Sequence, residues 1–549
     1  MTNTSSDIKT IYESLGKIYS QMHAIQRRNM DVYHLKLDTS APKDFPSIVP
    51  ATAKRIIRQG VSQLITDTPV IEVNCGTTIN EQKIAGKLTE LCYVLLEQWD
   101  NQNGIPPAQE LGFNLCLHGM AVKNNIYNPE YEGLESLQIN IPSPINFYPD
   151  PAGRFDLIVY NLYVGEIKEM ISRWKEAYPN GGFKDIPFTK SDTDTCTWVE
   201  YISAEKRGWC AIEGADAYEP SEMKTNILGL KPTYYRYSGW GITSPDGLPE
   251  EKSIGLYDGV ISSLEAEARG KTAIDNHLRL NVYGRYLFNK STGMTQEQVN
   301  QALLPGGAAL VDNPRDAVVP IPEVNINRDE WAYLAQLQDD IEGMTFNRAI
   351  QGNGAVEESG LKTMTRIRQS SLVFRPVRRS LELVMGKALY DAVLILKNDL
   401  VMGKTVKYSG KDSLDPKDIP EKFQIKVNYE SVNPEEDIER NEMGLKMLNN
   451  KALSLRTVLK DYFRVENPDE ELSQMIAETT ILQDPNTRMA LAAKILEAMG
   501  WTDAIQALEQ TKTQMRPEAR NKELLGSEQR LNEGNQNRPV STHAGGDYV

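Results

Sequence analysis

Residues 327–379 read NRDEWAYLAQLQDDIEGMTFNRAIQGNGAVEESGLKTMTRIRQSSLVFRPVRR, and this stretch decides the expected fold. Its first third predicts a helix over residues 329–345, because apolar side chains recur there at helical spacing. Those apolar positions are Trp331, Leu334, Leu337, Ile341 and Met344. Asn327 can cap this helix while Glu330, three residues on, reaches back to it.

The rest of the stretch predicts a loop and then a very long helix. Residues 346–359 are polar and contain Gly352 and Gly354, which favours a flexible loop. Residues 361–398 return to the helical pattern and would extend about 57 Å if continuous. Pro376 lies inside that pattern, so we expect it to kink the helix.

The segments upstream of residue 327 alternate between helix and strand. We expect helices through most of the first 130 residues, a proline-rich turn at 139–165 and hairpin strands at 196–240. Residues 253–278 again predict a helix, whereas 281–325 carry short strand-like pieces and no long helix.

Downstream, the pattern predicts a hairpin at 400–430 that includes the strand FQIKVNY. The acidic stretch NPEEDIERNE follows, and then small helices at 440–510. Residues 511–549 are rich in Gln, Asn, Glu and Gly, which is typical of a disordered tail.

Composition excludes several classes of protein. The 549 residues include 60 Lys and Arg against 75 Asp and Glu, for a formal net charge of −15. Such acidity argues against ordinary DNA binding, which neutralises phosphates with basic side chains. No stretch approaches the roughly 18–20 apolar residues of a membrane span, and the N-terminus lacks the basic start and apolar core of a signal peptide, so we expect neither. The five cysteines are odd in number, widely spaced and without a C-x-x-C pair, so we expect them to be reduced.

Motifs for catalysis or cofactor binding are missing from the sequence. There is no H-E-x-x-H, no zinc-spaced Cys/His cluster and no G-x-S-x-G elbow. GAVEESGLKT (354–363) fails as a phosphate loop, because Leu361 separates Gly360 from Lys362. We therefore expect no catalytic residue, no cofactor and no metal, and interpret the five histidines as core or surface residues.

The order of these parts resembles the portal (head-to-tail connector) proteins of tailed bacteriophages. Three further stretches are similar to that family, namely the run IPSPINFYPDP with the helix EIKEMISRWKEAYP, the segment ESGLKTMTRIRQSSLVFRPVRRSLE, and NPEEDIERNEMGLKMLNNKALSLRTVLKDYFRVENPDEEL. The resemblance covers residues 10–510 and implies an α+β portal fold with wing, stem, clip and crown.

The resemblance divides the chain into the parts of a portal subunit. These are an N-terminal wing (1–252), a first stem helix (253–280), a clip (281–326), a second stem helix (327–345), a tunnel loop (346–359), a long kinked wing helix with a wing hairpin (360–435), a helical crown (436–510) and a disordered tail (511–549).

The implied function is a ring, usually of about twelve subunits, at one vertex of a viral head. Double-stranded DNA would be packaged through it by a separate terminase and later ejected. Terminase and head–tail adaptors would dock on the clip, and major capsid and scaffolding proteins would surround the ring. The expected location is the virion, after assembly in the host cytoplasm, with no membrane involved.

Three sets of residues are candidates for function within that ring. The channel wall would carry Glu265, Glu267, Asp339, Asp340 and Glu342; the DNA-facing tunnel loop would carry Asn347, Arg348, Gln351, Asn353 and Glu357; and the subunit interface would carry Arg366, Arg368, Arg375, Arg378 and Arg379. An acidic wall would repel DNA phosphates, which are spaced at one charge per about 1.7 Å of duplex, and so prevent sticking.

Each set has an alternative interpretation. The acidic residues are equally well explained as solvated faces or inter-subunit ion pairs. Residues 346–359 could instead be a plain surface linker. The arginines could instead contact DNA phosphates. For the whole chain, the rivals are another virion ring or adaptor protein and an acidic cytosolic hydrolase.

Overall fold

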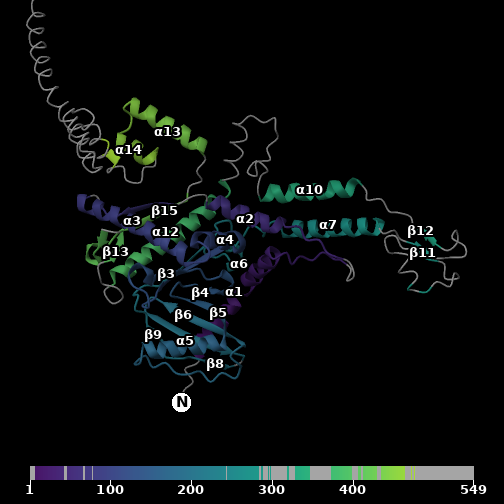
Figure 1. Cartoon of the computed structure of the whole chain (residues 1–549), viewed down its shortest axis with the longest axis horizontal. Helices are drawn as coiled ribbons and strands as arrows, with labels where there is room; N and C mark the ends of the chain where they lie inside the picture. Colours follow the sequence, from purple (N-terminus) through teal and green to yellow (C-terminus); the bar gives the residue numbers. More distant parts are fainter. Residues whose placement is uncertain are drawn as a thin grey trace, which may run out of the picture. The chain divides into compact units, whose positions relative to one another are not determined.

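The computed structural model describes residues 6–41, 46–65, 69–76, 78–214, 216–242, 244–282, 286–288, 295, 297, 318–320, 328–345, 372–398, 406–409, 412–429, 434–463, 471–472 and 475. The chain divides into two compact units, Met1–Val432 and Asn433–Val549. The first unit combines helices with antiparallel sheets, which agrees with the predicted α+β class (Figure 1). None of the described helices has the length and apolar character that crossing a membrane requires.

The N-terminal quarter is helical, as its sequence predicts. It forms α1 (Ser6–Tyr33), α2 (Thr52–Leu64), α3 (Ile79–Gln102) and α4 (Pro107–His118). A capping box fixes the start of α3, where the Thr78 side chain accepts from the Glu81 amide. Gly119 ends α4 with a φ of 68°, a left-handed conformation that favours glycine.

Two antiparallel sheets follow the helices. The larger sheet has the order β4 (Phe147–Pro149), β5 (Phe155–Tyr163), β6 (Thr195–Ser203), β7 (Lys206–Glu213) and β8 (Asp216–Tyr218), with β9 (Lys224–Thr225) also on β7. The smaller sheet has the order β10 (Thr233–Tyr237), β2 (Met120–Tyr127) and β3 (Leu137–Asn140). Short helical turns connect the strands at Gly133–Ser136 (η1) and Pro144–Asn146 (η2), and the one-turn helix α6 (Pro249–Lys252) follows β10.

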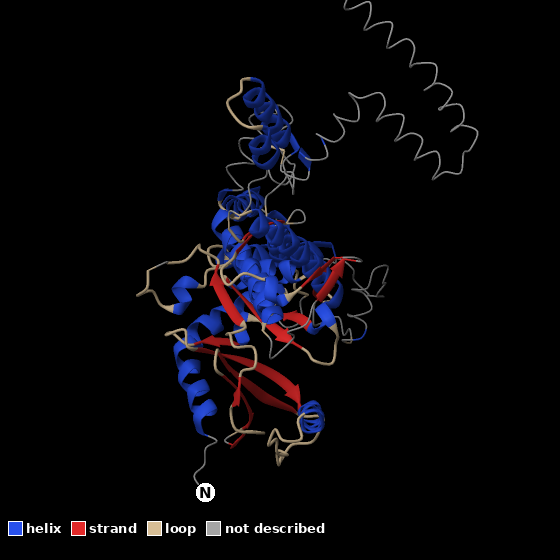
Figure 2. Cartoon of the chain, turned by 90° about the vertical axis from the view of Figure 1, so that its left-hand side faces the viewer, coloured by secondary structure: helices blue, strands red, loops and turns tan. Residues whose placement is uncertain are grey.

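Helices cover both faces of the larger sheet. Neighbouring residues of β6 point to opposite faces, as the period of two requires: Val199 packs with Leu15 and Met22 of α1. Trp198 packs instead with Ile167 of α5 (Val164–Ala177). The N-terminal helix therefore lies along one face of the strands (Figure 2), and α5 lies against the other.

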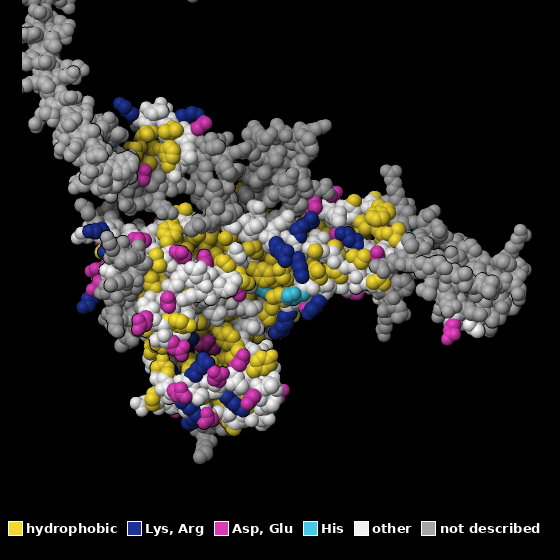
Figure 3. Space-filling model, viewed as in Figure 1, with side chains coloured by type: hydrophobic (Ala, Val, Ile, Leu, Met, Phe, Trp, Pro, Cys, Tyr) yellow, Lys and Arg dark blue, Asp and Glu magenta, His cyan; other side chains and the backbone are white. Residues whose placement is uncertain are grey.

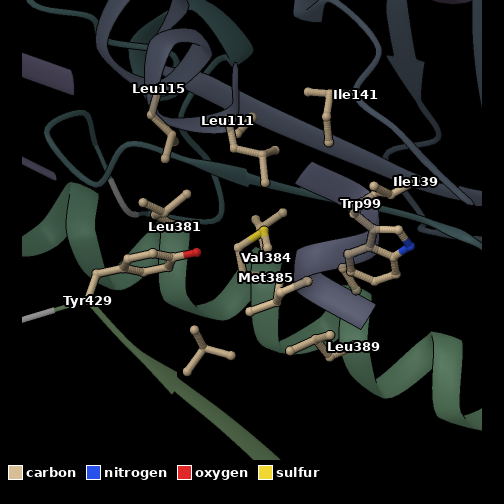
Figure 4. Packing of buried hydrophobic residues seen from close by; sticks show 14 of the residues in the cluster. Trp99, Leu111, Leu115, Ile139, Ile141, Leu381, Val384, Met385, Leu389 and Tyr429 are labelled. Carbon is tan, nitrogen blue, oxygen red and sulfur yellow. The ribbon is translucent and has the colours of Figure 1, made fainter. Parts of the chain in front are cut away.

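The main core lies between α3, α4, β3 and α12 (Arg375–Lys397). Figure 4 shows Trp99 of α3 beside Val384 and Leu389 of α12, and all three side chains are inaccessible to solvent. The Trp99 indole donates a hydrogen bond to the Leu137 carbonyl oxygen over 2.9 Å, so this large side chain is buried with its polar atom satisfied.

Strands far apart in sequence close this core. β1 (Val70–Asn74) pairs antiparallel with β15 (Gln424–Asn428), with Val70 opposite Asn428. The remaining elements nearby are β13 (Val406–Ser409), β14 (Asp412–Leu414) and the turn η5 (Pro416–Asp418). The predicted strand FQIKVNY is thus confirmed.

A buried ion pair joins the smaller sheet to α12. Lys123 of β2 and Asp391 of α12 form a salt bridge, and their side chains are 0% and 1% exposed. The Lys123 ammonium also donates to Asn125 Oδ1 (2.7 Å) and to the Pro232 carbonyl oxygen (2.8 Å). Burial lowers the pKa of Lys123 to about 8, although the Asp391 carboxylate acts in the opposite direction.

The predicted long helix does not run unbroken through Pro376. Leu372 is helical, residues 373–374 form a turn, and α12 begins at Arg375, so the helical path is interrupted just before the proline, which lies in the first turn of α12. Proline is well tolerated there, because the first amides of a helix have no intrahelical acceptor. The chain before it is held by the Trp240 indole, which donates to the Val373 carbonyl oxygen over 2.9 Å. Residues 361–371 lie outside the described part.

Two paired helices of the first unit lie between α6 and α12 in the sequence. They are α7 (Ile261–Val282) and α10 (Arg328–Met344), and between them in sequence come the paired strands β11 (Tyr286–Phe288) and β12 (Val318–Pro320). α10 confirms the predicted helix 329–345. α7 starts later than the predicted residue 253, because the Leu256 amide bonds the Cys116 carbonyl oxygen and the Tyr257 hydroxyl donates to Ala53.

The second unit contains α13 (Pro434–Asn449) and α14 (Leu455–Asp461) among its described residues. α13 includes the acidic stretch that the sequence placed before the helices, so that prediction is corrected. Ser454 caps α14 by accepting from the Thr457 amide. The predicted crown beyond residue 475 and the predicted tail 511–549 lie outside the described residues.

Candidate functional site

The paired helices α7 and α10 carry all five residues that were predicted to line the channel. They pack side by side, with Leu334, Leu337 and Ile341 of α10 buried (Figure 1). A Cβ at Gly270 of α7 would lie only 2.6 Å from Leu334 Cδ2. The missing side chain at Gly270 therefore permits the close approach of the two helices.

Glu267 joins three helices at the root of this pair. Its carboxylate Oε1 accepts hydrogen bonds from Thr52 of α2 (3.3 Å), Lys271 of α7 (2.7 Å) and Gln338 of α10 (3.2 Å). The side chain is 0% exposed, and Oε2 has no hydrogen-bond partner among the described residues. A buried carboxylate with these partners fixes how α7 and α10 leave the core.

Two further ion pairs tie the same helices to the N-terminal helices. Arg28 of α1 lies 3.0 Å from Glu265 of α7, and Arg55 of α2 lies 3.8 Å from Glu342 of α10. Thr272 adds a two-way contact with Ile48, because its hydroxyl accepts from the Ile48 amide and donates to the Ile48 carbonyl oxygen, both over 3.0 Å. The helical pair is thus anchored on α1, α2 and the chain between them.

These contacts correct the predicted channel wall. Glu267 is wrong as a wall residue because it is fully buried. Glu265 and Glu342 are only 26% and 17% exposed and are occupied by arginines of the same chain. Asp339 and Asp340 are exposed on α10, so they remain the wall candidates.

Only some of the apolar residues predicted on α10 are buried. Leu334, Leu337 and Ile341 are buried, whereas Trp331 and Met344 are 53% and 65% exposed. Helical spacing alone did not distinguish residues that face α7 from residues on neighbouring sides of the helix.

The predicted interface arginines have partners within the chain where the structure describes them. Arg378 donates to the Gln63 carbonyl oxygen over 2.8 Å, and burial lowers its pKa. Arg379 lies 3.2 Å from Glu382, one turn further along α12. Arg375 is exposed. Arg378 is half-buried and bonded to Gln63 of its own chain, and its role at a subunit interface stays a prediction.

The other predicted site residues lie outside the described part of the chain. They are the five tunnel-loop residues Asn347, Arg348, Gln351, Asn353 and Glu357, and the two interface residues Arg366 and Arg368.

Burial shifts the pKa values of the buried histidines and cysteines. Burial lowers the pKa of His23 to about 4 and that of His118 to about 3, so both imidazoles are neutral at pH 7. The five cysteines are free and buried, and burial raises the thiol pKa of Cys92 to about 12. Among the described residues, no group of His, Cys, Asp and Glu could hold a metal ion.

Sequence reasoning missed the residues that anchor the helical pair. Gly270, Thr52 and Gln338 carry no recognisable motif. A signal did exist for Glu267: it follows Leu264 by three residues and precedes Ala268, both on the buried side of α7, and Lys271 lies one turn further on. A carboxylate on the apolar side of a helix, with a cation at i+4, indicates a buried ion pair.

Comparison with known proteins gives two structural similarities. No family model and no curated protein matches the chain. A chain of the "Neck of empty GTA particle computed with C6 symmetry" matches 74% of this chain and 88% of its own length, at 10% identity and a TM-score of 0.37. One from the "Virion of native gene transfer agent (GTA) particle" matches 78% and 90%, at 9% identity and 0.38. TM-scores this low carry no argument about fold or function.

Proposed function

We propose that copies of this chain form the ring-shaped portal of a phage-like virion, through which double-stranded DNA enters and leaves the head. The observation that carries this proposal is the insertion α7–β11–β12–α10, which leaves one core and returns to it before α12. A long helical pair with a small strand pair at its end suits a protein that lines a passage and presents a docking tip. The role is structural rather than enzymatic.

The proposed partners are those that the resemblance to portal proteins implies. The tip, within residues 281–326, would meet the terminase during packaging and head–tail adaptors afterwards. The wing, residues 1–252, would meet major capsid and scaffolding proteins. About twelve subunits would close the ring, which assembles in the host cytoplasm and remains in the virion.

The wall would be less acidic than the sequence alone indicates. Asp339 is the wall residue that we retain, because it is exposed and lies on the side of α10 away from the buried Leu334 and Ile341. A ring of Asp339 carboxylates repels phosphates from all sides, and that opposes adhesion of the duplex. Asp340 lies about 100° further round the helix, on a different side from Asp339.

The loop 346–359 would contact DNA with Asn347, Arg348, Gln351, Asn353 and Glu357. Deleting residues 351–355 should leave rings intact and reduce the fraction of DNA-filled heads. A normal fraction of DNA-filled heads in that deletion variant would refute the assignment of the loop to DNA contact. It would not affect the proposal that the subunits form a ring.

Imaging of the purified full chain tests the ring itself. We expect annular particles with a central hole by negative-stain electron microscopy, and mass photometry gives the number of subunits. A monomer at micromolar concentration would overturn the proposal.

The wall is tested with Asp339→Lys and its neutral control Asp339→Asn. Rings of the lysine variant should retain duplex DNA at low salt, whereas the asparagine variant should release it. Equal behaviour of the two variants would refute the role of Asp339.

A further inference from the structure

α10 presents a second, exposed flank besides the side that packs on α7. Asp329, Tyr333, Asp340 and Met344 follow one another at spacings of four, seven and four residues, which places them in a sector about 60° wide. Tyr333 is 54% exposed and Met344 is 65% exposed. We call these four residues the acidic flank.

The acidic flank faces away from α2. Glu342, which lies 3.8 Å from Arg55 of α2, is two residues from Asp340 and therefore about 160° away around the helix. The side of α10 that is bound to α2 and the acidic flank are thus on opposite sides of the same helix.

α2 presents the opposite charge. Its sequence TAKRIIRQGVSQL contains Lys54, Arg55 and Arg58 and no acidic residue. Arg55, Arg58 and Ser62 are exposed at spacings of three and four, so they form one row along α2, which we call the basic face. Arg55, at the start of this row, also lies 3.8 Å from Glu342 of its own chain, whereas Arg58 is further from that contact along the helix. Figure 3 shows basic side chains gathered where α2 runs beside α7. Within the described residues, Arg58 has no ion-pair partner.

We propose that the acidic flank of α10 docks on the basic face of α2 in a second copy of this chain. Charge complementarity supports this occupant: the chain is strongly acidic overall, yet α2 carries only cations. Asp340 would pair with Arg58, and the Tyr333 ring can receive a guanidinium on its face. The methylene stems of Arg55 and Arg58 would cover Met344.

The position of the two surfaces determines the form of the assembly. They differ from one another, and within one chain the acidic flank faces away from the contact between α10 and α2, so each copy would bind the next head to tail. Repetition of such a contact gives a closed ring when the rotation between copies closes. This inference rests on the proposed function and adds the residues and the charge pattern that would join the subunits.

Charge reversal and charge exchange test the contact on the full chain. Asp340→Lys and Arg58→Glu should each reduce the ring fraction at 0.1 M salt at least about tenfold by mass photometry. The double variant should recover it to within about threefold, because the exchanged pair is again complementary. Lys184→Glu, an equal charge change on an exposed residue beside the larger sheet, should leave rings unchanged.

Several outcomes would overturn the contact while leaving the portal proposal intact. Rings that persist in both single variants would do so. So would Arg58→Glu rings that form normally but lose affinity for duplex DNA, since the basic face would then bind phosphates. An Asp340→Lys chain with a lowered melting temperature but normal rings would show that the flank packs within one chain. A wild-type monomer, in contrast, would remove the proposed function itself.

Discussion

Replacing Asp391 with Asn should destabilise the first unit by about 3 kcal/mol, because breaking a buried ion pair leaves an uncompensated charge. Both side chains of the Lys123–Asp391 pair are at most 1% exposed, so water cannot replace the lost carboxylate. The size lies at the lower end of the usual range of about 3–5 kcal/mol, since Asn125 and Pro232 still accept from the ammonium.

The pH dependence of this loss has a definite sign. Burial already holds the pKa of Lys123 at about 8, below the unfolded value near 10.4, so the folded chain binds fewer protons between those values. Removal of Asp391 lowers the folded pKa further. The difference between variant and wild type should therefore be largest below pH 7 and should narrow above pH 8, where the wild type also gives up the proton.

Urea unfolding of the full chain, followed by tryptophan fluorescence, measures the loss. Lys387→Gln is the matched control: Lys387 lies 2.8 Å from the other oxygen of Asp391 but is 37% exposed, so its removal should cost less than about 1 kcal/mol. A double-mutant cycle with Lys123→Met should show coupling above about 1 kcal/mol. A loss below about 1 kcal/mol for Asp391→Asn, or additive single variants, would refute the reasoning.

Three other substitutions and conditions give further tests. Gly119→Ala should lower the free energy of unfolding by more than about 2 kcal/mol, because the new Cβ would lie 2.4 Å from the Ile254 backbone and the φ of 68° is strained for alanine. Gly16→Ala is the control: no atom lies within 4 Å of its new Cβ, so this variant should have a raised melting temperature. Between pH 6.5 and 4 the unfolded chain protonates His23 and the folded chain does not, so the His23 contribution to stability should fall by at most about 3 kcal/mol. His118 adds to the fall in the same direction, and the total loss should be smaller in His23→Gln; equal urea midpoints at pH 7 and 4.5 in the wild type would contradict this. Glu267→Gln should cost about 1–3 kcal/mol and speed amide exchange in α7 and α10, and unchanged exchange rates would exclude its anchoring role.

The sequence predicted elements whose pattern is strong and local. α10 lies within one residue of its predicted bounds, because its apolar repeat is regular over four turns. The hairpin strands of the larger sheet follow from their β-branched and aromatic content. These features depend on neighbours along the chain, which the sequence displays directly.

Features decided by distant contacts were not predictable in the same way. Pro376 can kink a helix or begin one, and the choice depends on contacts such as that between Trp240 and Val373. Glu267 has the same residue type as the exposed acids near it, and only α2 and α10 make it a buried bridge. Arg378 meets Gln63, more than three hundred residues away.

The pairing of β1 with β15 has a consequence for how the nascent chain folds. The ribosome must complete about three-quarters of the protein before the segment 424–428 becomes available to the segment 70–74. Until then residues 70–74 expose unpaired backbone N–H and C=O groups, and these groups can form hydrogen bonds with other chains. Premature termination after α10 should therefore yield aggregates rather than a smaller soluble fragment.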